Sequence, residues 1–494
     1  MSKIKSLILG SAAGLVAIGG AQAADLPLKA KAVEYVKVCS LYGAGFYYIP
    51  GTDTCIKLGG YLRVDIGALA TASHGPYYSG AGGQGNRYAD NYTFRSRMAF
   101  TVDTRTATEY GVVRTFGQGD FTFDSRNSVN GPWSPVNTPA SGTFAVENAF
   151  VQFAGFTFGK SASVYSTPWH SVPGNYSVFL FGTEDSVTGV NNIHYTWDFG
   201  NGFSASLGVD EGGAYDRTTL ANLSTNAVNA TGFTGAAQGY GGLAAPDIVG
   251  NMKLDQAWGL IQFSAAAHNL HAGYYNPALE TSGHPSDTWG FAVQGALQLK
   301  NLPTGPGDDL KVVAGYADGA TKYIIGTAVS SPSFALFGGG DAGAYQSVGF
   351  GATNDGIFGL NGSIEKTKAW GISGAFAHNW NPNWQTTVFG GYASVTHNDN
   401  AKALFCGAYN AANAGAASAD YSCNPDFAVA QIGTRTTWTP VKNLTLGAEV
   451  MYSHLDQDFT GSKVLAPGGT KPVTAYNYKD QNIVSGMFRI QRNF

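Results

Sequence analysis

Three arginines and one aspartate lie within the stretch TFRSRMAFTVDTR, residues 93–105. Side chains of an extended strand point alternately to its two faces. One face therefore carries Thr93, Arg95, Arg97, Thr101, Asp103 and Arg105. The other face carries Phe94, Ser96, Met98, Phe100 and Val102. A dense row of guanidinium groups beside a water-filled passage can sort ions and polar solutes by their charge.

Two further arginines extend this basic set. Arg63, in CIKLGGYLRVDIGAL, lies on the polar face of the preceding predicted strand. Arg114 follows on the next segment, although Tyr110, Val112 and Phe116 share its parity. Arg63, Arg95, Arg97, Arg105 and Arg114 are thus the candidate basic side of a charged passage. One alternative stays open, in which these arginines form ion pairs with neighbouring acids such as Asp65, Asp103 or Glu109. They would then be solvated residues of the lumen wall without a role in selectivity. Arg435, Glu449 and Arg489 share the lumen parity on the last segments, and no role is predicted for them.

Alternating segments repeat along almost the whole chain, and we expect about sixteen strands. Their predicted ranges are 57–69, 91–104, 109–123, 143–154, 156–160, 191–198, 203–210, 247–255, 258–268, 288–299, 309–317, 364–368 or 369–380, 384–396, 427–438, 443–454 and 478–494. Short turns rich in Gly, Pro, Asn and Asp alternate with long loops, as in an up-and-down meander. The stretch 320–370 is left open, with one further hairpin or none.

The apolar faces of these strands must be shielded from water by other protein elements or by lipid. No helical periodicity separates the strands, so we expect no helical layer, and the alternatives are a β-sandwich or a closed barrel in a membrane. Tryptophans flank the short turns, at Trp197, Trp258, Trp380, Trp384 and Trp438. Aromatic girdles, unequal loops, an apolar outside and a polar inside are typical of a transmembrane β-barrel. We therefore predict an all-β antiparallel barrel whose apolar faces meet lipid.

The first residues favour export. MSKIKSLILGSAAGLVAIGGAQA has two early lysines, a short apolar run and an A-x-A site, which predicts a signal peptide over residues 1–23. Residues 24–56 are then a periplasmic lead-in, and residues 57–494 are the barrel. The mean hydropathy of −0.08 and the 494-residue length fit two or three soluble domains as well as one large barrel.

The four cysteines form two local pairs in sequence. Cys39 and Cys55 are close together, as are Cys406 and Cys423. In an oxidising compartment this spacing favours two short-range disulfides, while long-range pairing remains formally open. Neither pair has the C-x-x-C spacing or the nearby histidines of a zinc site.

The sequence gives little support for a nucleotide site, a metal site, a hydrolase site or nucleic-acid binding. GAGGQG at 80–85 matches a nucleotide motif but lies among glycines without a strand–helix context. His268 and His271 in HNLH lack a third metal ligand. His194 has lumen parity but no evident serine partner for hydrolysis. The net charge of −4 argues against nucleic acid. We expect no enzyme activity, no cofactor and no metal.

Three segments carry a resemblance to a known family. The A-Q-A-A-D start, VEYVKVCSLYGAGFYYIPGTDTCIKLGGYLRVD and ENAFVQFAGFTFGK resemble the general porins of alphaproteobacteria. The resemblance implies a sixteen-stranded homotrimeric barrel in outer-membrane lipid and lipopolysaccharide, through which small hydrophilic solutes and ions diffuse. A substrate-specific channel is the alternative.

The same resemblance implies an inward-folded third external loop. Mapped onto this chain, the loop covers residues 161–189 and contains VFLF, an apolar run unusual for a loop left in water. Glu184 and Asp185 are then the acidic side of the constriction, opposite the arginines, although the loop lacks the family's usual Pro-Glu-Phe-Gly-Gly stretch. The terminal Phe494 resembles the signal that the barrel-assembly machinery reads.

Overall fold

The computed structural model describes residues 37–494 except 71–74, 125–141, 171, 178–179, 184–187, 214, 216, 226 and 327–331, and leaves out the side chain of residue 81. The predicted signal peptide, 1–23, and the first part of the predicted lead-in lie outside the described residues.

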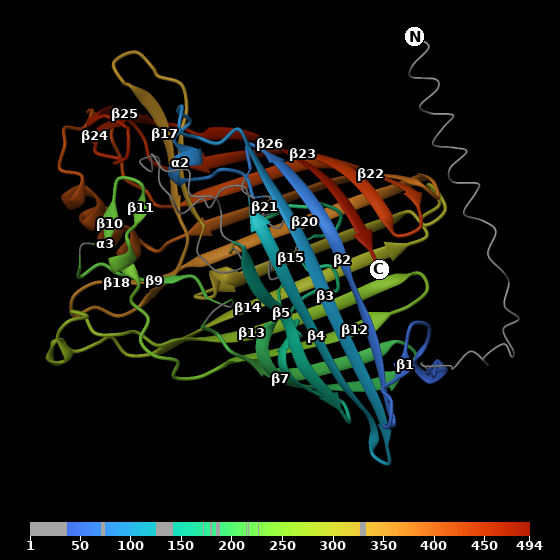
Figure 1. Ribbon diagram of the computed structural model, residues 1–494. Coiled ribbons are helices and arrows are strands. Elements are labelled where there is room, and N and C mark those ends of the chain that lie inside the picture. Colours follow the sequence, from blue (N-terminus) through green and yellow to red (C-terminus); the bar gives the residue numbers. More distant parts are fainter. Residues whose placement is uncertain are drawn as a thin grey trace, which may run out of the picture.

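Sixteen antiparallel strands form a closed barrel (Figure 1). They are β2 Thr54–Ala68, β3 Tyr92–Thr108, β4 Gly111–Asp124, β5 Thr143–Phe153, β6 Phe156–Ser161, β7 Val190–Gly200, β8 Phe203–Asp210, β12 Asp247–Asp255, β13 Gly259–Leu270, β14 Thr288–Lys300, β15 Asp309–Asp318, β20 Lys368–Asn381, β21 Trp384–Thr396, β22 Phe427–Val441, β23 Leu444–Gln457 and β26 Gln481–Asn493. Each strand pairs with the next, and β26 closes the ring on β2 from Tyr61↔Asn493 to Ala68↔Gly486. The predicted barrel is thereby confirmed, and a sandwich or a set of soluble domains is excluded.

Strand β3 has the two faces that its sequence predicts. Phe94, Met98 and Phe100 are about 40% exposed on the outside of the single barrel, whereas Arg95 is 8% exposed. Because every strand of a closed barrel pairs on both sides, no backbone edge is left in the lipid layer. The apolar side chains therefore form the outer surface, and the charged ones face the lumen.

Short turns join the strands at one end of the barrel and long segments join them at the other (Figure 1). Asn201 and Asn443 take positive φ angles of 52° and 65° in two of the short turns. Asparagine tolerates this left-handed conformation better than most residues because its amide can hydrogen-bond locally. Trp438 lies beside the turn that contains Asn443, and its ring stacks on that of Trp384, beside the β20–β21 turn, with centroids 5.7 Å apart.

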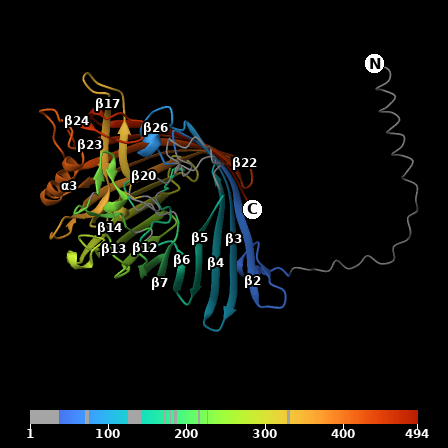
Figure 2. The ribbon, with the colours of Figure 1, turned by 60° about the vertical axis from the view of Figure 1, so that its left-hand side comes forward.

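The long segments build a compact cap at the opposite end (Figure 2). Its small strands are β9 Thr219–Asn222, β10 Val228–Asn229, β11 Gly232–Phe233, β16 Ser333–Phe337, β17 Gln346–Ala352, β18 Asn354–Phe358, β19 Glu365–Lys366, β24 Ser462–Leu465 and β25 Thr474–Tyr478. Short helix α2 spans Gly80–Gly83, and helix α3 spans Asp399–Ala412. Within 320–370, the strands that end before β20 belong to this cap and not to the barrel wall.

One helix, α3, follows β21 in a stretch where no helical periodicity was seen, and it packs in the cap rather than over the apolar faces of the barrel. It begins at the N-cap Asn398, whose side chain accepts a hydrogen bond from Ala401 N at 2.8 Å. Phe405 and Tyr409 are buried against Phe350 and Phe459 of the cap. Tertiary packing, rather than a strong sequence periodicity, therefore stabilises this 14-residue helix. Within the described ranges, no helix is long and apolar enough to cross a membrane.

Both predicted disulfides are present. Cys39–Cys55 joins the lead-in to the start of β2, where β1 (Tyr47–Tyr48) also pairs with Cys55 and Ile56. Cys406–Cys423 joins α3 to the segment that precedes β22. The alternative long-range pairing is excluded.

Candidate pore constriction

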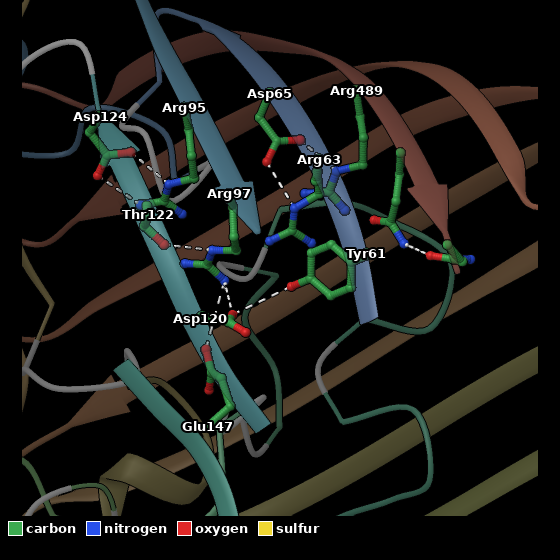
Figure 3. Close-up of polar contacts among 12 residues, drawn as sticks. Tyr61, Arg63, Asp65, Arg95, Arg97, Asp120, Thr122, Asp124, Glu147 and Arg489 are labelled. Atoms are coloured by element: carbon green, nitrogen blue, oxygen red, sulfur yellow. Dashed lines mark hydrogen bonds and ion pairs between the residues drawn. The ribbon is translucent and has the colours of Figure 1, made fainter. Parts of the chain in front are cut away.

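Arg63, Arg95 and Arg97 lie together on one wall of the lumen, formed by β2, β3 and β4 (Figure 3). Arg105 and Arg114 face each other across β3 and β4 close to the turn at residues 109–110, so the structure separates them from the other three along the wall. Each of the five arginines is held by a carboxylate: Arg63 by Asp65 at 3.1 Å, Arg95 by Asp124 at 2.7 Å, Arg97 by Asp120 at 2.8 Å, and Arg105 and Arg114 by Asp103 at 3.0 Å. Asp65 and Asp103 are two of the local partners left open by the sequence. The wall therefore alternates positive and negative charge and is not purely basic.

Three of the acids on this wall were not predicted. Asp120 and Asp124 lie on β4 and Glu147 on β5, with Glu147 3.7 Å from Arg97. The register of the β3–β4 hairpin places Arg95 directly opposite Asp124. That register follows from the tight turn at residues 109–110, so pairing the two predicted strands across this turn would have found it.

The predicted inward loop, 161–189, crosses the lumen to the far wall. Asn251 on β12 and Lys311 on β15 donate side-chain hydrogen bonds to Val164 O and Pro173 O. Leu180 and Phe181 are buried, and the Phe181 ring lies 5.6 Å from that of Tyr78. The second half of the apolar VFLF run thus packs on a wall, as expected, whereas Val178 and Phe179 lie outside the described residues.

A clamp on β22, β23 and β26 holds the middle of the loop. Glu449 accepts hydrogen bonds from Tyr176 N at 2.5 Å and Ser177 N at 3.1 Å. Arg435 donates to Asn175 O at 3.2 Å. The guanidinium groups of Arg435 and Arg489 lie 4.8 and 4.3 Å from the centre of the Tyr176 ring. Burial raises the pKa of the Tyr176 phenol, and the two arginines act in the opposite direction.

The clamp also reaches the charged wall. Arg489 lies 2.6 Å from Asp65, which Arg63 also contacts (Figure 3). Sequence reasoning placed Arg435, Glu449 and Arg489 in the lumen but gave them no role. In the folded chain they anchor the loop, an arrangement that strand parity by itself does not reveal.

The predicted acidic pair, Glu184 and Asp185, lies outside the described residues. Its position opposite the arginines therefore stays a prediction. At the loop's flanks, Thr183 Oγ1 lies 3.3 Å from Ser373 Oγ on β20, and Lys160 donates to Thr188 Oγ1 at 2.8 Å.

The histidines of HNLH have separate partners. His268 contacts Asp247 at 2.7 Å, and His271 contacts Asp287 at 2.8 Å. Over the part of the chain that the structure describes, no three His, Cys, Asp or Glu side chains are grouped to hold a metal ion.

A family model described as the porin subfamily matches residues 25–487. The chain belongs to this porin subfamily. Porin Omp2b of Brucella abortus (strain 2308) is 36% identical over 265 residues, which are 52% of this chain and 64% of that protein. Porin Omp2b of Brucella suis biovar 1 (strain 1330) is 36% identical over 269 residues with the same coverage. The aligned region thus spans less than two thirds of these relatives.

The outer membrane channel DcaP of Acinetobacter baumannii has a similar fold. Its TM-score is 0.57 at 14% identity, over 90% of this chain and 99% of that one. Family membership and the closed barrel together place this porin in the outer membrane of a Gram-negative cell.

Proposed function

We propose that this porin forms a water-filled channel for the passive diffusion of small hydrophilic solutes and ions. The observation that carries the proposal is the loop 161–189, which Glu449 on β23 holds inside the lumen beside a wall of paired arginines and carboxylates. A narrowed passage between a fixed loop and a charged wall brings solutes within a few ångströms of both signs of charge, where electrostatic interactions are strong.

The charge pattern favours weak selectivity. Because every arginine of the wall has an acid beside it, the wall exposes little net charge and both cations and anions can pass. Glu184 and Asp185 would complete a transverse field across the constriction that orients dipolar solutes. A barrel hydrolase is less well supported, since His194 Nδ1 lies 3.1 Å from Asn192 Oδ1 rather than beside a serine hydroxyl.

The assembled state is part of the proposal. We infer a homotrimer from the family resemblance, surrounded by lipid and lipopolysaccharide and inserted by the barrel-assembly machinery. The terminal Phe494 exchanges backbone hydrogen bonds with Gly60 of β2, at 3.1 and 3.2 Å. This pair of hydrogen bonds extends the contact that closes the ring between β26 and β2.

Planar-bilayer recording of the purified protein tests the proposal. We expect stepwise current increases in KCl, with closures in groups of three, and a small reversal potential across a salt gradient. Mock-purified detergent extract is the control. A protein that inserts into the bilayer but carries no ionic current would refute channel function, and single independent closures would refute the trimer.

A further inference from the structure

A groove of about 350 Å³ opens on the lumen at the short-turn end of the barrel, beside the clamped loop. It lies between the ends of β20, β21, β22 and β23 and is bordered by Tyr176. Its walls carry neutral amides and hydroxyls, supplied among others by Asn379, Gln385, Thr437 and Thr445. Among the described lining residues, Arg435 alone is charged.

Arg435 differs from the other lumen arginines because no carboxylate makes close contact with it, although Glu449 and Asp309 attract it from further away. Glu449 faces it directly across the β22–β23 pair, but both Glu449 oxygens accept hydrogen bonds from the loop backbone. Asp309, another nearby acid, lies 2.8 Å from Lys311. In the described chain no carboxylate comes within 4 Å of the Arg435 guanidinium, whereas Arg489 and the five arginines of β2, β3 and β4 each have one.

Not every N–H group of the Arg435 guanidinium has a hydrogen-bond acceptor. Its Nη1 donates to Asn175 O, and its Nε is buried without a hydrogen-bond partner. A half-buried guanidinium whose N–H groups meet no carboxylate costs free energy, and an incoming carboxylate would offset that cost with charge-assisted hydrogen bonds.

We propose that this groove is a transit site for a small hydroxylated monocarboxylate, a hydroxy acid or a sugar acid. The inference rests on the proposed channel function and names the solute class that the channel retains. The single positive charge of Arg435 matches one carboxylate. Gln385 already donates to Asn379 Oδ1 at 3.0 Å, and Thr445 Oγ1 lies 3.3 Å from Thr439 Oγ1. The Thr437 hydroxyl and the remaining lone pairs and N–H groups of these side chains can bond the hydroxyl groups of the solute.

The position of the groove suits a solute in passage. Short turns lie on the periplasmic side of outer-membrane barrels, so the groove is a station between the constriction and the periplasm. It is open to the lumen on one side, which keeps binding weak enough for release, as conduction requires.

Titration of the open channel with gluconate tests this site. In wild-type channels in KCl, gluconate should reduce the current along a saturating curve, whereas glucose at equal concentration should only lower it in proportion to bulk conductivity. Arg435→Gln should raise the half-blocking gluconate concentration about tenfold. Thr437→Val, which leaves the loop contacts in place, should raise it about threefold. Lys300→Gln removes a positive charge at the same end of the barrel, where Lys300 pairs with Asp255, and should leave the titration unchanged.

Two results would overturn the site. One is a gluconate response that does not saturate in the wild type; the other is the same half-blocking concentration in wild type and Thr437→Val. Because Arg435→Gln also removes a contact to the loop, a changed KCl conductance in that variant makes Thr437→Val the deciding measurement. Failure of the proposed function has a separate signature, since KCl then carries no current at all.

Discussion

Glu449 on β23 accepts the backbone N–H of Tyr176 at 2.5 Å, although the two residues are 273 positions apart in the chain. Ser177 N adds a second hydrogen bond to the same carboxylate at 3.1 Å. One buried side chain of the wall thus holds two consecutive peptide groups of the inward loop. The width of the passage depends on this attachment, and the first prediction concerns it.

Replacing Glu449 by Ala should release the loop and raise single-channel conductance and open-channel noise. Hydrogen bonds to a charged group contribute about 1.5–3 kcal/mol each, so the attachment loses about 3 kcal/mol or more. Glu449→Gln keeps one acceptor oxygen and should give an intermediate conductance. Asp456→Asn removes a carboxylate from the outer face of the same strand and serves as the control. Wild-type conductance in Glu449→Ala would show that other contacts fix the loop.

Placing an arginine at Phe100 should destabilise the barrel, by about 2–4 kcal/mol if the site lies near the bilayer midplane. Phe100 is 40% exposed on the outer face, where lipid cannot solvate a guanidinium. The neighbouring substitution Thr101→Arg points into the lumen and should be tolerated. Urea unfolding in lipid vesicles measures both variants. Equal destabilisation of the two would contradict the assignment of the faces.

Charge variants of the arginine wall should change ion selectivity in a predictable direction. Replacing Arg95 and Arg97 by Ser exposes the carboxylates of Asp124 and Asp120, so the reversal potential should shift towards cation preference. Neutralising Glu184 and Asp185 should shift it towards anions. Salt should weaken both shifts, because the screening length falls to about 3 Å at 1 M.

Arg492→Ser provides the control for these variants, because Arg492 lies at the end of β26 and bonds Lys442 O in a turn. It should leave the reversal potential unchanged. Unchanged potentials in the wall and loop variants alike would place the selectivity of the channel elsewhere.

Reduction of Cys406–Cys423 should loosen the cap without opening the pore. By the chain-entropy estimate, closing a loop of this length contributes about 3 kcal/mol, and the effect should stay local to α3 and residues 413–423. Hydrogen exchange of α3 should therefore quicken in Cys406→Ser/Cys423→Ser while KCl conductance hardly changes. Cys39→Ser/Cys55→Ser, at the other end of the barrel, should leave exchange in α3 as it is.

Acid should loosen the same cap through Asp426. Burial by itself would raise the pKa of this carboxyl, but hydrogen bonds from His397 at 2.9 Å and Lys402 at 2.6 Å lower it. A carboxyl with a lowered folded pKa stabilises the fold above its ordinary value near 3.9, and that stability is lost as pH falls through the folded value.

We therefore expect the protection of the α3 amides, measured against their intrinsic exchange rates at each pH, to fall below about pH 4. Asp426→Asn should show fast exchange already at pH 7 and a flatter pH profile. Asp399→Asn, in the first turn of α3, is the control for loss of a nearby negative charge. The same pH profile in wild type and Asp426→Asn would assign the acid sensitivity to another group.

Alternation of side chains was enough to predict the barrel from the sequence. Period-two segments identify the strands, since a slip of one residue would turn every apolar side chain of β3 into the lumen. The expected range 91–104 corresponds to β3 at Tyr92–Thr108, and 203–210 to β8 at Phe203–Asp210. The disulfides were also predictable, because neighbouring cysteines need little chain closure to meet.

Only the tertiary structure decided how the charges are used. Whether Arg97 faces free water or Asp120 depends on the register between neighbouring strands. The alternation of side chains along one strand does not specify that register. Whether Glu449 only lines the lumen or also holds Tyr176 depends on how the loop folds back into the barrel. No local sequence pattern predicts a contact between residues so far apart in the chain. Sequence therefore determined which face each side chain occupies, while long-range packing determined its partner.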